Sequence, residues 1–115
     1  MGIVGEQAVV LIDNTACYWY DLDMDATLLY RERLVLVENR FVEMVVWQLD
    51  TPLKGSTHSF KYRLALVVNG VCVLRYDNES GKGDHRHLGG VERVYRFTTP
   101  QNLLADFWKD VENWR

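Results

Sequence analysis

The 115-residue chain lacks most of the features that mark secreted, membrane or fibrous proteins. It has only two prolines, and no apolar run approaches the roughly 20 residues that a membrane-spanning helix requires. Its first twenty residues carry no basic side chain of the kind that opens a secretory signal peptide. We therefore expect a cytoplasmic protein that does not contact a membrane.

Cysteine is also scarce, which argues against a disulfide framework. The two cysteines, Cys17 and Cys72, lie far apart without C-x-x-C spacing, and each has apolar or aromatic neighbours. We predict that both are reduced thiols in the core. A chain of this length can bury roughly two thirds of its unfolded surface, so it requires neither a metal nor a disulfide to fold.

The composition is that of one globular domain. Apolar types make up 48% of the residues and charged types 25%, which excludes wholesale disorder. Nothing in the chain marks a linker, so we predict a single domain over residues 1–115, with residues 1–6 frayed.

Strand patterns dominate most of the chain. Apolar or alternating runs predict strands at residues 8–12, 34–37, 41–49, 60–68, 71–76 and 93–98, with a turn at 38–40 and a loop at 52–59. Asn69-Gly70 between two such runs is a strong signal for a tight hairpin, because both central positions of a type I′ turn have positive φ.

The chain ends in a pattern typical of a helix. Thr99 suits the N-cap, and Pro100 suits the first helical position, where its missing N–H costs nothing. Apolar residues then recur at helical spacing and form one broad stripe: Leu103, Leu104, Phe107, Trp108, Val111 and Trp114. We predict a two-layer α+β fold, in which an antiparallel meander of five to six strands packs against this amphipathic helix.

The distribution of charge is more informative than the net charge of −3. Residues 1–50 hold nine acidic and three basic side chains, a balance of −6. Residues 51–97 hold eight basic and four acidic ones, a balance of +4, and all three histidines. A polarised protein of this kind can present a basic surface to a phosphate backbone, although the same pattern also arises from charges on solvated strand faces.

Residues 76–90 form a polar, glycine-rich segment that core packing does not explain. Three interpretations remain open. The segment is a polar surface loop, or His85 and His87 bind a metal with a third ligand such as His58 or Asp77. Alternatively, it carries out phosphodiester chemistry without a metal. It lacks the spacing of a P-loop.

The third interpretation uses the chemistry of imidazole. If the segment is extended, His85 and His87 point to one face, and Asp84 and Arg86 point to the other. Imidazole can accept or donate a proton near neutral pH, and RNA supplies its own nucleophile in the 2′-hydroxyl. Four nearby cations could hold the phosphate: Lys61, Arg63, Lys82 and Arg86.

Several short elements resemble the TumE family of small prokaryotic toxins. They are KYRL at residues 61–64, YDNE at 76–79, GKGDHRH at 81–87, and YRF at 95–97 running into LLADF at 103–107. The resemblance covers roughly residues 30–115 and is most specific in the GKGDHRH element. It implies a toxin of a toxin–antitoxin pair, with a ribonuclease-like or translation-blocking activity, that is inhibited by a helix-turn-helix DNA-binding antitoxin.

From the matching elements we select the candidate site residues. The catalytic candidates are Lys82, Asp84, His85 and His87, and the substrate-binding candidates are Lys61, Arg63, Asp77 and Arg86. One histidine would take the 2′-hydroxyl proton and the other would protonate the leaving 5′-oxygen. Lys82 and Arg63 would stabilise the phosphorane, while Asp84 would orient an imidazole or pair with Arg86. No cofactor and no metal are expected.

A rival from another class is a binding module that cuts nothing and contacts its antitoxin or a protein target through the GKGDHRH loop. The acidic first half of the chain could attract a basic DNA-binding partner. A third alternative is a small metal-dependent nuclease or hydrolase. An exposed edge near residues 8–12 could also pair two chains into a homodimer.

Overall fold

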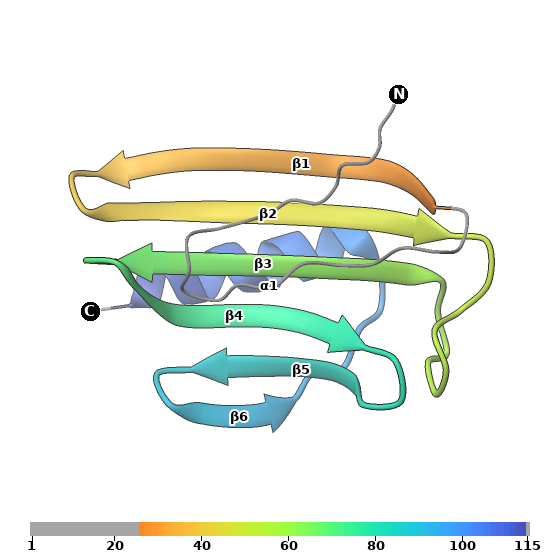
Figure 1. The fold of residues 1–115 in the computed structure, drawn as a ribbon. Helices are drawn as coiled ribbons and strands as arrows, with labels where there is room; N and C mark the ends of the chain where they lie inside the picture. Colours follow the sequence, from red (N-terminus) through yellow and green to blue (C-terminus); the bar gives the residue numbers. More distant parts are fainter. Residues whose placement is uncertain (1–25, 115) are drawn as a thin grey trace.

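The computed structural model describes residues 26–114. The predicted strand at residues 8–12, its proposed role in a homodimer, the frayed residues 1–6 and Cys17 lie outside the described residues. The described residues form six strands and one helix, which are labelled in Figure 1: β1 (Ala26–Val37), β2 (Arg40–Leu49), β3 (Phe60–Val68), β4 (Val71–Glu79), β5 (Gly83–Leu88), β6 (Val91–Val94) and α1 (Pro100–Asn113).

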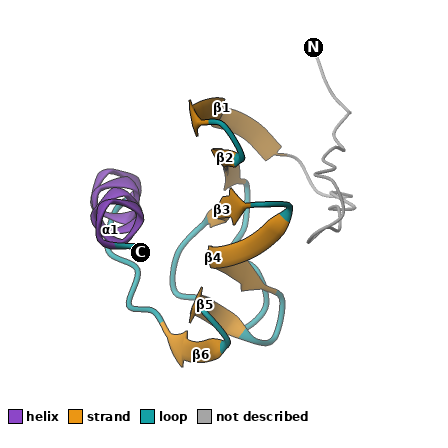
Figure 2. Ribbon diagram, turned by 90° about the vertical axis from the view of Figure 1, so that its left-hand side faces the viewer, coloured by secondary structure: helices purple, strands orange, loops and turns teal. Residues whose placement is uncertain are grey.

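The strands form a single sheet in the order in which they occur along the chain. Each strand pairs antiparallel with the next, from β1 at one edge to β6 at the other. Helix α1 lies against one face of this sheet (Figure 2). The predicted α+β meander with a C-terminal helix is therefore confirmed. Within residues 26–114, no helix is long and apolar enough to cross a membrane.

The tight turns follow the local sequence. Asn69 and Gly70, between β3 and β4, both have positive φ, at 52° and 79°, as a type I′ hairpin requires. Asn39, between β1 and β2, has a φ of 71°, which asparagine tolerates better than most residues. Both predicted turns are confirmed, and residues 51–59 form the predicted loop.

The core lies between the sheet and α1. Alternate residues of β2, β3 and β4 point toward the helix, which contributes Leu103, Phe107 and Val111. The sheet contributes the remaining buried members: Val42, Met44, Val46, Tyr62, Leu64, Leu66, Leu74 and Tyr76. The hydroxyl of Thr99 accepts a hydrogen bond from the Asn102 N–H and caps the helix, as predicted.

Three predicted boundaries are wrong. The strand predicted at residues 34–37 is β1, which begins at Ala26. Residues 76–90 are not a loop, because β4 continues to Glu79, and β5 and the start of the turn to β6 fill most of the rest. The strand predicted at 93–98 is β6, which ends at Val94. After it, Tyr95 and Phe97 leave the sheet and pack against the core, because the chain must cross to the helix layer.

Cys72 is a free, half-buried thiol in β4 and not a fully buried core residue. Burial raises the pKa of this thiol, which keeps it protonated near neutral pH.

Candidate functional site

The GKGDHRH element forms the turn between β4 and β5 and most of β5 itself. Gly81 and Gly83 both have positive φ, which permits the tight turn around Lys82. Beyond the turn β5 is extended, so its side chains alternate between the two faces of the sheet. The predicted alternation is present: His85 and His87 share the outer face, away from α1, while Asp84 and Arg86 share the helix side.

The outer face holds a connected group of five polar residues, which we call the outer-face cluster. Its members are Arg75 of β4, Lys82 of the turn, His85 and His87 of β5, and Glu92 of β6. The Glu92 carboxylate lies 3.1 Å from His85 Nδ1 and 3.4 Å from Lys82 Nζ. It also lies 3.6 Å from His87 Nε2, which is in turn 3.0 Å from a guanidinium nitrogen of Arg75.

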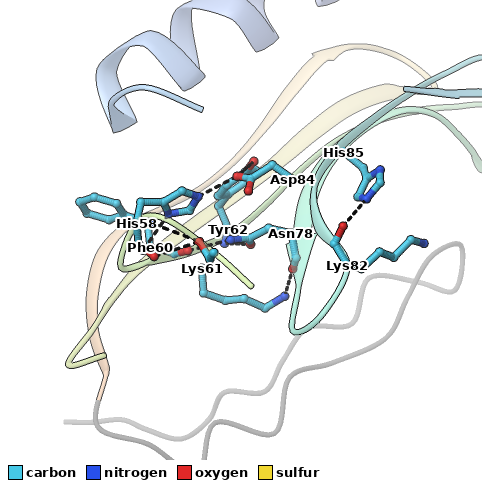
Figure 3. Close-up of polar contacts among 9 residues, drawn as sticks. His58, Phe60, Lys61, Tyr62, Asn78, Lys82, Asp84 and His85 are labelled. Atoms are coloured by element: carbon cyan, nitrogen blue, oxygen red, sulfur yellow. Dashed lines mark hydrogen bonds and ion pairs between the residues drawn. The ribbon is translucent and has the colours of Figure 1, made fainter. Parts of the chain in front are cut away.

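The two histidines of the cluster have different surroundings. Nε2 of His85 donates to the backbone carbonyl of Lys82 at 2.8 Å, as Figure 3 shows, and its Nδ1 faces Glu92. Nε2 of His87 must accept from Arg75, because a guanidinium can only donate. Burial and the charge of Arg75 lower the pKa of His87, so this imidazole is neutral near pH 7. Nε2 is therefore a donor in His85 and an acceptor in His87.

Glu92 is ionised in this setting. Desolvation raises its pKa, but the positive charges of Lys82 and of His87 in its protonated form together lower it by more. Its side chain is 38% exposed, so these ion pairs lie at the surface.

The predicted residues Lys61, Arg63 and Asp77 extend the same face toward the middle of the sheet. All three are buried. Asp77 pairs in register with Arg63 on one side and with His85 on the other, and its carboxylate lies 3.3 Å from Arg75 Nε. The Lys61 ammonium donates to the Asn78 carbonyl, and burial lowers the pKa of Lys61 to about 8. These residues lie beside the outer-face cluster on β3 and β4, with their side chains buried.

Asp84 lies on the helix side of β5 in a separate group with His58 and Tyr62 (Figure 3). Its carboxylate accepts hydrogen bonds from His58 Nε2 at 2.8 Å and from the Tyr62 hydroxyl at 2.6 Å. Nδ1 of His58 accepts from the Phe60 N–H at 3.1 Å, and the His58 ring stacks on Phe97 at 4.0 Å. Both ring nitrogens of His58 are therefore occupied, and the group clamps the start of β5 to the 51–59 loop.

This arrangement changes the predicted roles of Asp84 and Arg86. Asp84 does orient an imidazole, but that of His58 and not that of His85 or His87. The alternative pairing of Asp84 with Arg86 is wrong, since Arg86 contacts Asp110 of α1 at 3.2 Å. Neither residue shares a face with the histidine pair.

The metal alternative required His58 or Asp77 as a third ligand. His58 lies on the opposite face from the histidine pair, and the Asp77 carboxylate is paired with Arg75. Among residues 26–114, no group of three or more histidine, cysteine or acidic side chains is arranged to hold a metal ion.

The sequence analysis did not select Glu92 and Arg75, and it named His58 only as a possible third metal ligand. The β5–β6 register brings Glu92 opposite His87, and the β4–β5 register brings Arg75 opposite it from the other side. The sequence signal for Glu92 was the pair of glycines at 89–90, because a tight hairpin at these residues sets the register of β6 against β5. Interpreting residues 76–90 as one loop concealed it.

Comparison with known proteins supports the resemblance that the GKGDHRH element carries. No curated protein and no solved structure matches the chain. A family model described as Toxin TumE matches residues 18–115, so the similarity begins earlier than the residue 30 estimated from the motifs. Because the match covers well over half of its length, the chain belongs to the TumE toxin family.

Proposed function

We propose that this toxin cleaves RNA without a metal ion, using His85 and His87 as the proton-transfer groups. One observation carries the proposal. Both imidazoles lie on the outer face, where Glu92 is close to both rings and the cations of Lys82 and Arg75 flank them. Membership of a toxin family supports a toxic activity, and metal-independent RNA cleavage needs only an acid, a base and cations around the phosphate.

The surroundings of the two rings support a division of roles. His87, which is neutral, takes the proton of the 2′-hydroxyl, and the 2′-oxygen attacks the adjacent phosphorus. The bond from phosphorus to the 5′-oxygen breaks, and His85 donates a proton to that leaving oxygen. The products are a 2′,3′-cyclic phosphate and a free 5′-hydroxyl. Residues at i and i+2 of a strand are roughly 7 Å apart, which lets two rings flank one phosphate.

Cations of the outer face stabilise the negative charge that develops on the phosphorane. Lys82 is half exposed and can turn toward a bound phosphate. Arg75 contacts the lone pair of His87 in this structure, so a phosphate that recruits Arg75 also frees His87 to act as the base. Arg63 and Lys61 are buried in β3, so they add positive charge only at longer range.

The family implies an antitoxin partner. We propose that it is a helix-turn-helix DNA-binding protein whose basic surface is attracted by the acidic first half of this chain, where residues 1–50 carry a balance of −6. This partner silences the toxin and does not take part in the chemistry.

Induced expression of the wild type beside the His85→Ala/His87→Ala variant tests the proposal. We expect growth arrest and new RNA fragments with the wild type, and neither with the variant. Lys109→Ala, which removes an exposed cation from α1, is the control and should behave like the wild type. The variant must also keep its thermal transition and its antitoxin binding.

Two outcomes would contradict the proposal. Arrest by the double variant shows that the histidines are not needed. Arrest by the wild type with intact RNA favours the rival function, a binding module that blocks its target through the β4–β5 turn.

A further inference from the structure

The Glu92 carboxylate is the common contact of the outer-face cluster. A single oxygen, Oε2, lies within 3.1 to 3.6 Å of His85 Nδ1, Lys82 Nζ and His87 Nε2. Lys82 and His85 thus face one anionic oxygen, and the proposed reaction places the same two groups at the phosphate and its leaving oxygen. His87 Nε2 accepts from Arg75, so it lies beside this oxygen without binding it.

We propose that Glu92 occupies the subsite of a phosphate oxygen and must leave it before RNA binds, so that this arrangement is a self-inhibited one. The inference rests on the proposed function, because it places the reacting phosphate at the same cluster. In this arrangement Glu92 acts as a gate, which means that its carboxylate blocks the phosphate subsite and restrains the activity.

The Glu92 carboxylate uses only part of the hydrogen-bonding capacity of the outer-face cluster. Nδ1 of His85 is shielded from solvent, and it makes no hydrogen bond of good geometry within the described part of the chain, although Glu92 lies at ion-pair distance. A tetrahedral phosphate carries several acceptor oxygens, so it can meet His85 and Lys82 with separate atoms. The cluster is therefore better suited to a phosphate than to the group that occupies it.

Glu92 is also able to leave. It belongs to β6, a four-residue strand at the edge of the described sheet, in which every residue is exposed. Its ion pairs lie at the surface, where water and salt weaken them. A rotation of the Glu92 side chain suffices to open the subsite, and the backbone of β6 can stay in register with β5.

Glu92 is attached to β6 beside the subsite, and this attachment determines which anions can displace it. A carboxylate held on the neighbouring strand competes at an effective concentration on the order of millimolar or above. A small anion that makes a single contact is therefore a poor competitor. A polyanion such as RNA contacts a further cation at the same time, such as Arg75, and displaces Glu92 more readily. The gate thus favours a nucleic-acid chain over free phosphate.

Replacement of Glu92 by glutamine tests this inference with inorganic phosphate as the probe. The imidazole signals of His85 and His87, followed by NMR, report the dissociation constant for phosphate. We expect Glu92→Gln to bind phosphate at least about tenfold more tightly than the wild type, because a negative charge within 4 Å of the subsite has been removed. Glu79→Gln removes an equal charge from an exposed position at the end of β4 and should leave the affinity unchanged within about twofold.

A second variant, Glu92→Ala, removes the side chain and should give the same direction of change. Thermal unfolding of both variants verifies that the sheet is intact. Equal phosphate affinity in the wild type and both variants would overturn the inference. Loss of RNA cleavage by Glu92→Gln with unchanged phosphate affinity would also overturn it, because Glu92 would then support the reaction.

The same measurements separate the gate from the proposed function. Tighter phosphate binding by Glu92→Gln together with faster RNA cleavage supports both. Tighter phosphate binding while every variant and the wild type leave RNA intact supports the anion subsite and contradicts the ribonuclease.

Discussion

Alternation along β5 separates two kinds of polar residue that are adjacent in the sequence. His85 and His87 face outward with Glu92, while Asp84 and Arg86 face the helix layer and bind His58 and Asp110. The helix-side residues have their hydrogen-bonding capacity used within the fold. The outer-face residues are held mainly by surface contacts that a ligand can replace, and we therefore assign the proposed chemistry to them.

The pKa of His87 provides a test at the scale of one residue. Burial and the charge of Arg75 lower this pKa, so Arg75→Gln should raise it toward the ordinary value of 6.5. Because the pKa of His87 is lower in the folded state than in the unfolded state, the free energy of unfolding falls as the pH drops below about 6.5. Arg75→Gln should make this fall in stability smaller. NMR titration of the His87 ring gives the pKa directly.

Arg33→Gln is the matched control for this titration. Arg33 is an exposed arginine of β1 that pairs with Glu43, far from β5 in the sheet order. An unchanged His87 pKa in Arg75→Gln would contradict the assigned contact between Arg75 and His87.

At the scale of elements, the β4–β5 hairpin connects the outer face to the core. Asn78, buried in β4, accepts a hydrogen bond from the Tyr62 N–H and donates to the Phe60 carbonyl, which ties β3 to β4 beyond their last register pair. The Asp84 clamp ties the other strand of the hairpin to the 51–59 loop. The turn that carries Lys82 is thus anchored on both sides.

Helix α1 provides the second layer, and its central aromatic residue should carry much of the stability. Phe107 is fully buried and makes edge contacts with Tyr76 and Trp108. Phe107→Ala should lower the free energy of unfolding by about 3–5 kcal/mol, because it removes a large side chain and leaves a cavity. Urea denaturation measures the change.

Lys109→Ala on the exposed side of α1 should alter the free energy of unfolding by no more than about 0.5 kcal/mol. Similar effects of the two substitutions would show that α1 does not form the core layer in solution.

At the scale of the whole molecule, the two faces of the sheet differ in what they carry. One is covered by α1 and forms the core, and the other carries the outer-face cluster beside Lys61 and Arg63. The net charge of −3 is compatible with the proposed contact with RNA, because Arg75 and Lys82 lie partly exposed on this outer face. Association should therefore depend on local charge and on salt.

Salt dependence tests this view of RNA binding. The logarithm of the affinity for single-stranded RNA should fall linearly with the logarithm of the salt concentration, and Lys82→Ala should reduce the slope by about 0.7, the value for one phosphate contact on a single strand. The measurement uses an uncleavable 2′-deoxy oligonucleotide and fluorescence anisotropy. Lys109→Ala should leave the slope unchanged, and equal slopes for all three proteins would exclude Lys82 from phosphate contact.

Much of the fold was determined by local sequence. Asn69-Gly70 required a tight hairpin, Thr99-Pro100 started the helix, and alternating apolar residues predicted strands, because turn chemistry, capping and hydrophobic periodicity act over a few residues. The alternation of His85 and His87 with Asp84 and Arg86 was also predictable, since the side chains of any extended segment alternate.

Only the tertiary structure decided which residues meet. Glu92 and Arg75 reach the histidine pair through strand register, and His58 reaches Asp84 through a loop 26 positions away in the sequence. The tertiary structure also decided that the polar residues 83–88 form a strand. Their side chains find hydrogen-bond and ion-pair partners on both faces of the sheet, which the polar sequence alone does not indicate. Except for the register of β6, for which the glycines at 89–90 are a local signal, these contacts depend on the packing of the whole sheet.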